Sequence, residues 1–502
     1  MLRLISLEIL HHHVLGNTRL EFCKENGEGV DVNEIYTSVV IGVNGIGKSY
    51  LMRAIADIFS YLDALSRDAE IRKSPVGYKF YIKYKIGISV CEFTNIAEFE
   101  PAGWAARNYT YVSFKRDGEA ARIGQRVVPA RIVASTMTVT DKFTTVNTGR
   151  YIYKGIRNER SPGTTGTRTM IRKTVSGLLH SLDVKEGFRE ELAELLEHMG
   201  LRPRLEVGYT LRYKQVFLDP EMTSEKLCEI FDQQERYFEN RNSQLWGTAN
   251  FQKLRMDEEK LSRVANFLRE LAERNAERRD VRLNYSVLED PHRINRDRDA
   301  IEALSALDLL SFPSLRVFKR DTDFAFDQSS SGETHMLCQL IGIMSDIEHE
   351  SIVLIDEPEN SAHPSWQVNY IEWLKNIFSH YSDCHFIIAT HSHFLLTDLK
   401  PDTSDIIALE RDNDGGLHDV EGVDNAYCWS VDDILYRVFH VRNTRNYVFE
   451  SKMMELYQLI SNGTDDKRRI VDMVSELSRY QLNAEDPLKK LLDTAKAYVE
   501  SN

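Results

Sequence analysis

The sequence predicts an α/β protein in which a parallel sheet carries the functional residues, a largely helical insertion interrupts that sheet, and further helices form the C-terminal region. Apolar runs typical of buried parallel strands occur before residue 42 and again between residues 351 and 396. Amphipathic helical patterns fill much of the chain between these runs. We therefore expect four parts, namely a first sheet segment, an inserted arm, a second sheet segment and a helical C-terminal region, over residues 1–145, 146–310, 311–425 and 426–502.

Composition narrows the class of protein. The 502 residues are 42% hydrophobic and 28% charged, which is enough for two or three packed domains. The six cysteines include no CxxC pair, so neither a disulfide framework nor a zinc site is predicted, and a reducing cytoplasm fits. The N-terminal stretch lacks the pattern of a signal peptide, and no apolar run is long enough for a membrane span. We expect a cytoplasmic protein without a membrane segment.

The net charge of −14 argues against a broad basic surface for nucleic acid. One local candidate for nucleic-acid contact is the segment 157–173, in which five cations accompany a single acid: Arg157, Arg160, Arg168, Arg172 and Lys173.

The stretch IGVNGIGKSY (41–50) follows a β-branched run and precedes an amphipathic helix. It fits the P-loop pattern, in which backbone N–H groups face the phosphates, Lys48 reaches the β- and γ-phosphates and the Ser49 hydroxyl binds Mg²⁺. The helix that follows adds the partial positive charge of its N-terminus. The stretch therefore predicts ATP and Mg²⁺ as ligands, with the nucleotide held by Gly42, Asn44, Gly45, Gly47, Lys48, Ser49 and Tyr50.

Two later apolar runs end in residues suited to nucleotide chemistry. SIVLIDEPEN (351–360) ends in Asp356 and Glu357, at the carboxyl end of a predicted parallel strand, where open α/β sheets bind ligands. Asp356 is predicted to join Ser49 in holding Mg²⁺, and Glu357 to orient or deprotonate the attacking water. CHFIIATHSHFLL (384–396) places His391 at another strand end, where it can sense the γ-phosphate. The predicted catalytic residues are Glu357, Lys48 and His391.

Between these runs, FDQSSSGETHMLCQL (326–340) resembles the signature of the ABC-type ATPases of the SMC and RecF group. Ser330, Gly332 and Glu333 match that LSGGQ-like signature, whereas Ser329 and Ser331 depart from it. In the group, the signature contacts the γ-phosphate bound by the other subunit. The resemblance therefore implies an ABC-type ATPase head, shared ATP sites, and a homodimer or a higher even-numbered oligomer.

The resemblance is less complete at two other motifs. EPENSAHP (357–364) is similar to the D-loop, which implies that Ser361 and His363 lie at the dimer interface. The glutamine of the Q-loop is not evident. After the strand-like RIVAST (131–136), either Thr138 or Asp141 stands at its place, and both alternatives remain open.

The insertion is short, and the chain looks most similar to the ATPases of Septu-type and retron-associated anti-phage systems. The stretches that carry this likeness include YIYKG, IDEPENSAHPSWQ and the helical tail ending in AEDPLKKLLDTAKAYVE. The likeness implies an ATP-dependent switch that controls a separately encoded HNH-type nuclease or another effector. The segment IIALERDNDGGLHDVEG favours a hairpin over a Toprim nuclease domain, and the helices after it supply no further strands.

Two other functions remain open. A RecF-like DNA repair ATPase would clamp nucleic acid and would not control a nuclease, so salt-dependent DNA binding would distinguish it. A scaffold that only needs bound ATP would bind the nucleotide tightly without hydrolysing it.

Overall fold

The structure is a computed structural model of the 502-residue chain, and it divides the chain into two compact units, residues 1–428 and 429–502. Each unit is described by itself. The residues described are 1–23, 34–67, 75–96, 112–157, 166–239, 248–275, 281–311, 313–319, 323–325, 331–360, 362–412, 415–420, 429, 431–437, 446–461, 467–480 and 487–501.

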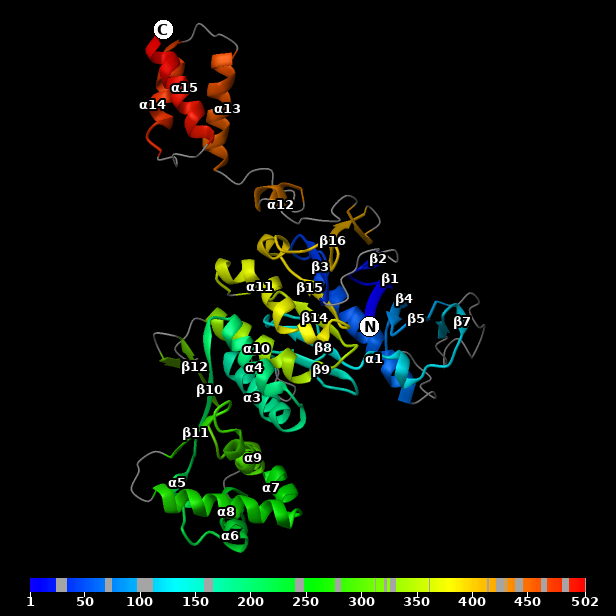
Figure 1. Cartoon of the computed structure of the whole chain (residues 1–502), viewed down its shortest axis with the longest axis vertical. Helices are drawn as coiled ribbons and strands as arrows, with labels where there is room; N and C mark the ends of the chain where they lie inside the picture. Colours follow the sequence, from blue (N-terminus) through cyan, green and yellow to red (C-terminus); the bar gives the residue numbers. More distant parts are fainter. Residues whose placement is uncertain are drawn as a thin grey trace. The chain divides into compact units, whose positions relative to one another are not determined.

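A seven-stranded sheet with the order β17-β16-β3-β15-β14-β8-β9 forms the centre of the first unit (Figure 1). All neighbouring strands in it are parallel except β16 and β17, which form the predicted hairpin. Asp356, the last residue of β14, pairs with Ala389 of β15 and Thr136 of β8. The predicted α/β fold class is therefore confirmed. The strands are β3 (Tyr36–Gly42), β8 (Ile132–Thr136), β9 (Tyr151–Gly155), β14 (Ile352–Asp356), β15 (His385–Ala389), β16 (Ser404–Arg411) and β17 (Leu417–Asp419).

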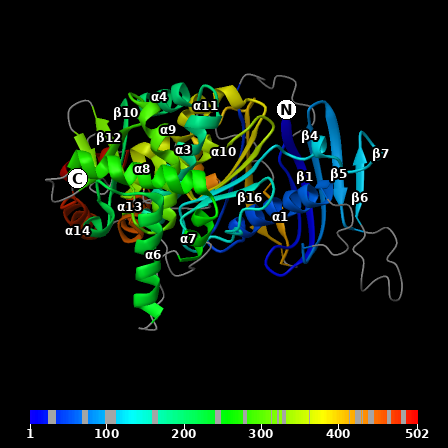
Figure 2. The same ribbon diagram turned by 90° about the horizontal axis from the view of Figure 1, so that it is seen from below.

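Helix α1 (Lys48–Arg67) is buried on more than the one face that its amphipathic pattern predicts. It packs on the parallel sheet and also beneath a second, antiparallel sheet of order β2-β1-β4-β5-β6-β7 (Figure 2). Phe59 meets the Tyr84 ring at 5.2 Å, and the Tyr78 hydroxyl donates to the Ala54 carbonyl. The second sheet explains the extra burial. Its strands are β1 (Leu2–His12), β2 (Gly16–Glu21), β4 (Lys79–Ile86), β5 (Ser89–Thr94), β6 (Ser113–Arg116) and β7 (Glu119–Ala120), and a short helix η1 (Gln125–Val127) follows.

Helices form a further layer beside the parallel sheet (Figure 1). α10 packs on β8 and β9, and α3 packs along α10, where the Ser181 hydroxyl donates to the Ser345 carbonyl. Strand β9 and helix α3 lie in the segment expected to be the arm, yet both belong to the layers of the head. The elements of this region are α3 (Thr167–Val184), α4 (Phe188–His198), α10 (Ser331–Asp346), α11 (Pro364–Ile377), η3 (Ser379–Tyr381) and η4 (His393–Leu396).

The inserted arm contains strands as well as the expected helices. An antiparallel sheet of order β11-β10-β12-β13 leads into it. Helix α8 buries Leu261, Val264 and Leu268, the apolar stripe that the sequence shows. The arm elements are β10 (Leu201–Thr210), α5 (Lys214–Phe217), α6 (Ser224–Glu239), α7 (Thr248–Arg255), α8 (Glu258–Asn275), β11 (Arg282–Ser286), α9 (Pro291–Ala306), β12 (Ser314–Lys319) and β13 (Asp323–Ala325).

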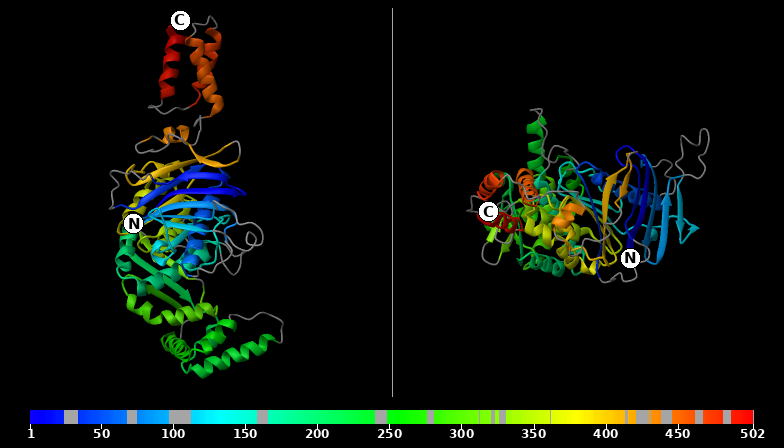
Figure 3. Two further views of the ribbon diagram at one scale, coloured as in Figure 1. Left: turned by 90° about the vertical axis from the view of Figure 1, so that its right-hand side faces the viewer. Right: turned by 90° about the horizontal axis from the view of Figure 1, so that it is seen from above.

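The second unit is helical, as the sequence predicts (Figure 3). It comprises α12 (Val431–Arg437), α13 (Tyr447–Ser461), α14 (Lys467–Leu477) and α15 (Pro487–Ser501). Its last three helices share a small core that includes Leu456, Leu477 and Leu492. Among the described helices of the whole chain, none is both long enough and apolar enough to cross a membrane.

Candidate functional site

The P-loop connects the end of β3 to the start of α1. Gly45 and Gly47 adopt φ values of 78° and 128°, which side-chain-bearing residues rarely adopt. A Cβ on Gly47 would also come within 2.9 Å of the Leu15 Cδ2, whereas a Cβ on Gly45 would meet no atom within 4 Å. The loop is therefore held closely on one side by the turn between β1 and β2, and it is open at Gly45. This geometry leaves backbone N–H groups available to an anion.

Lys48 is nearly buried at the base of this loop. Its Nζ donates to the Gly42 carbonyl at 2.9 Å and lies 2.8 Å from the His391 Nε2. Burial lowers the pKa of Lys48 to about 8, and the carboxylates of Glu357, Asp356 and Glu359 oppose that shift. A bound phosphate would favour the charged form of the ammonium group in the same way. The structure thus brings two predicted site residues, Lys48 and His391, into contact across the ends of β3 and β15.

Asp356 is 1% exposed, and neither of its carboxylate oxygens has a hydrogen-bond partner within the described ranges. Burial raises the pKa of Asp356 to about 7, while the nearby Ser49 hydroxyl and the Lys48 ammonium group act in the opposite direction. A buried carboxylate without partners is costly unless a cation neutralises it. Oxygen donors of this kind fit Mg²⁺, so the residues present suit the predicted metal.

Glu357 follows Asp356 in a strained backbone conformation, with φ at 51°. Its N–H donates to the Ala389 carbonyl at 2.8 Å, which anchors the turn to β15. Its Oε1 lies 3.4 Å from the His391 Nε2, and His391, followed by Lys48, lowers the pKa of Glu357 despite the opposing effect of burial. The Glu357 carboxylate is therefore kept ionised, which is the state in which it can accept a proton.

Glu359 is a site residue that the sequence analysis missed. Its Oε1 accepts a hydrogen bond from the His391 backbone N–H at 2.6 Å, and its buried Oε2 has no hydrogen-bond partner within the described ranges. Burial raises the pKa of Glu359. The signal in the sequence was a second acid two residues after Glu357, across Pro358. A cavity of about 390 Å³ opens here, lined by Asn44, Gly45, Glu357, Glu359, Asn360 and His391.

The signature residues are placed only in part. Ser330 and Ser361 lie outside the described residues. α10 begins at Ser331, so Gly332 and Glu333 stand in its first turn, as the motif predicts. Glu333 accepts a hydrogen bond from the Lys319 Nζ at 3.1 Å. Neither Gly332 nor Glu333 lines the cavity at the P-loop.

Tyr50 and His363 occupy positions beside the site. Tyr50 follows Ser49, and its ring lies 5.5 Å from the His13 ring and 5.5 Å from the Lys142 Nζ. His363 caps the N-terminus of α11, where its ring accepts from the Ser365 N–H. Tyr50 therefore borders the P-loop, and His363 begins the helix after the D-loop-like turn.

The structure separates the two Q-loop alternatives. Asp141 is buried and fully engaged, because Arg157 binds both of its carboxylate oxygens and the Tyr153 hydroxyl donates to it at 2.9 Å. Thr138 follows β8, the strand beside Asp356, and its hydroxyl lies 2.8 Å from that of Thr136. The geometry favours Thr138. It also shows that Arg157, one cation of the 157–173 segment, has an internal role.

Comparison with known proteins agrees with the resemblance drawn from the motifs. Residues 177–397 match the family model described as an AAA domain, putative AbiEii toxin, Type IV TA system. The Septu protein PtuA of Bacillus thuringiensis is 24% identical over 181 residues, which is 33% of this chain and 44% of that protein. The match thus spans less than half the length of this curated relative. Over these parts of its length the chain is similar to an AAA-domain family and to PtuA.

Matches among solved structures include two SMC heads and RecF. The Smc head domain of Pyrococcus furiosus, crystallised with an extended coiled coil and the C-terminal domain of ScpA, gives a TM-score of 0.31 at 12% identity, covering 88% of this chain and 100% of its own. The SMC head of Thermotoga maritima gives 0.34 at 11% identity, covering 83% and 98%. The recombination mediator RecF gives 0.29 at 12% identity, covering 84% and 98%.

Proposed function

We propose that this chain binds and hydrolyses ATP at a site completed by a second subunit, and that the nucleotide state controls a separately encoded effector in an anti-phage complex. The observation that carries the proposal is the cluster of Lys48, Asp356, Glu357 and His391 at adjoining ends of β3, β14 and β15. The PtuA relationship supports the defence role, and an HNH-type nuclease is the effector that the resemblance implies.

The residues divide the chemistry among them. Lys48 and the N–H groups of the P-loop would bind the β- and γ-phosphates. Ser49 and Asp356 would hold Mg²⁺, which supplies charge neutralisation at the phosphates when bound. Glu357 would align the attacking water and accept its proton, because its carboxylate is ionised and lies beside His391. The signature of the partner subunit, with Ser330 and Gly332, would close the site over the γ-phosphate.

The test is Glu357→Gln, which keeps the shape of the side chain and removes the proton acceptor. ATP binding should persist, whereas hydrolysis should fall by about 10² to 10⁴. Subunits with uncleaved ATP should accumulate as dimers in size-exclusion chromatography. Glu350→Gln is the matched control, since Glu350 lies just before the amino end of the same strand and binds the N-terminal ammonium group. Equal hydrolysis by the two variants would refute the assignment of Glu357.

Cells test the defence role separately. Cells that carry the Glu357→Gln variant together with the neighbouring effector gene should lose phage protection, measured as plaque counts. A repair clamp would instead make them sensitive to DNA damage without changing plaque counts. The feature that favours this second function is the exposed pair Arg168 and Arg172 on α3. Sensitivity to DNA damage together with normal phage protection would therefore favour the DNA repair function over control of an anti-phage effector.

A further inference from the structure

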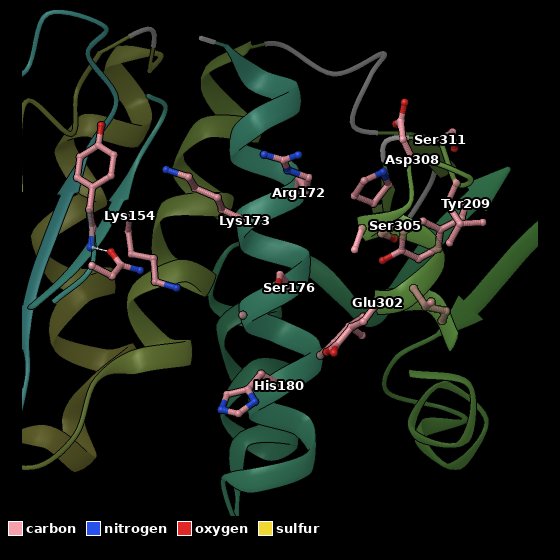
Figure 4. Close-up of a pocket in the computed structure, with 18 residues that line it drawn as sticks. Lys154, Arg172, Lys173, Ser176, His180, Tyr209, Glu302, Ser305, Asp308 and Ser311 are labelled. Carbon is pink, nitrogen blue, oxygen red and sulfur yellow. Dashed lines mark hydrogen bonds between the residues drawn. The ribbon is translucent and has the colours of Figure 1, made fainter. Parts of the chain in front are cut away.

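A second cavity, of about 660 Å³, lies between α3 and the arm, and none of the P-loop residues line it (Figure 4). Helix α3 forms one wall, and β10, the end of α9 and residues just after α9 form the facing wall. A volume of this size is typical of pockets for small molecules. The ATP site does not account for this cavity, because the two share no lining residue.

Tyr209 of β10 gives the first indication of a ligand. Its side chain is only 6% exposed and lines the cavity, yet its hydroxyl has no hydrogen-bond partner among the described residues. Burial, followed by the charge of Glu302, raises the pKa of Tyr209, so the hydroxyl keeps its proton and can donate. The hydroxyl oxygen is not among the fully buried polar atoms that lack a partner, so it is open to the cavity. The cavity beside it is where that partner can bind.

The wall formed by α3 supplies positive charge. Arg172, Ser176 and His180 follow one another at intervals of four residues, so they share one face of α3 and all line the cavity. Lys173 is held beside them, because its Nζ donates to the carbonyls of Gly155 and Arg157. Arginine with lysine and a hydroxyl is a set of donors that suits a phosphate group.

The charge is not uniform across the cavity. The acidic side chain of Glu302 lies on α9, opposite the cations of α3 (Figure 4). A bare anion would be repelled by that carboxylate, whereas a ligand with a phosphate at one end and hydroxyl or amino groups at the other would match both walls. Phosphate esters of nucleosides have this distribution of groups.

We propose that this cavity binds a nucleoside monophosphate, with the phosphate at Arg172 and Lys173 and the sugar or base at Tyr209 and Glu302. The site is distinct from the P-loop and does not depend on it. Because one wall belongs to a head helix and the other to the arm, the ligand would join these two parts of the chain.

The experiment measures binding of adenosine 5′-monophosphate to the full-length chain by calorimetry. The measurement is made in the native chain and in Lys48→Ala, which removes the P-loop cation. Arg172→Gln is the principal variant, and Tyr209→Phe deletes only the unpaired hydroxyl. Arg168→Gln is the matched control, because Arg168 is also exposed on α3 but does not line the cavity. Inorganic phosphate is titrated in parallel.

We expect the monophosphate to bind Lys48→Ala as it binds the native chain. Arg172→Gln should weaken binding by about tenfold or more, and Tyr209→Phe by about threefold, with no change for Arg168→Gln. Absence of binding at millimolar concentration, or equal effects of Arg172→Gln and Arg168→Gln, would overturn the proposal. Inorganic phosphate binding as tightly as the nucleotide would overturn the nucleoside part. Loss of binding in Lys48→Ala alone would assign the ligand to the P-loop.

Discussion

The two ends of strand β15 carry histidines with opposite roles. His385 at the amino end is fully buried, and both of its ring nitrogens have protein partners, the Leu4 N–H at 3.0 Å and the Ser38 hydroxyl at 2.8 Å. His391, just past the carboxyl end, is partly exposed and contacts Lys48 and Glu357. The same strand thus supports the core at one end and the reactive site at the other, as open parallel sheets commonly do.

Two buried lysines, Lys48 and Lys375, differ in the same way, one at the ATP site and one with structural partners. Their substitution gives the largest expected difference, which is in ATP affinity. Burial lowers the pKa of both Lys48 and Lys375. Lys375, however, donates to the Thr403 hydroxyl at 2.6 Å and pairs with Glu34. Lys48→Ala should abolish measurable ATP binding, because the phosphates lose their fixed cation, while Lys375→Met should lower thermal stability and leave ATP affinity unchanged. Calorimetry with ATP measures both. If the two variants lost ATP affinity equally, Lys48 would have no role at the nucleotide that Lys375 lacks.

Glu359 tests how far the reactive end depends on positioning. Its carboxylate fixes the backbone N–H of His391, so Glu359→Ala should reduce ATP hydrolysis by about tenfold. Glu359→Gln keeps an acceptor oxygen at the same place and should restore most of the rate. If ATP affinity fell and the maximal rate did not, the residue would act on binding and not through His391.

The sequence motifs predicted the residues at the carboxyl ends of β3, β14 and β15. They did not predict the other two sheets or the roles of Glu359 and Tyr209. Glycine spacing and apolar runs ending in Asp356 and His391 predict both the strands and their shared edge, because such runs are typical of parallel strands buried on both faces. The second sheet over α1 and the small sheet of the arm depend on pairing between segments far apart in the sequence. The role of Glu359 depends on its hydrogen bond to the backbone N–H of His391. The role of Tyr209 depends on a hydroxyl that lines a cavity and has no hydrogen-bond partner among the described residues. For Glu359 the sequence offers only the second acid after Glu357, and for Tyr209 the residue type carries no signal.

We expect the buried carboxylate of Asp356 to lower the free energy of unfolding of the chain without metal. Its buried, unpartnered carboxylate is unfavourable in the chain without metal, so Asp356→Asn should raise the free energy of unfolding by about 1 kcal/mol in the presence of a chelator. Adding Mg²⁺ and ATP should raise the melting temperature of the native chain by more than that of the variant, which keeps Lys48 but loses one Mg²⁺ ligand. A variant less stable than the native chain under chelation would mean that Asp356 has a structural partner.

The smallest effect concerns pH at the amino end. Burial, followed by the charge of Arg3, lowers the pKa of His385 well below its usual value, and the Tyr36 ring lies edge-on at 5.3 Å. The neutral ring is the form that accepts from Leu4. The unfolded chain therefore binds more protons than the folded one below about pH 6.5, where the stability supplied by neutral His385 is progressively lost.

Chemical unfolding at pH 7 and pH 5 measures this effect. The free energy of unfolding should fall less between the two pH values in His385→Phe than in the native chain. His380→Gln, an exposed histidine nearby, should retain the native pH dependence. If the free energy of unfolding of His385→Phe changed with pH as in the native chain, the acid sensitivity would arise from other residues. His385 would then not be the group that links stability to pH at the amino end of β15.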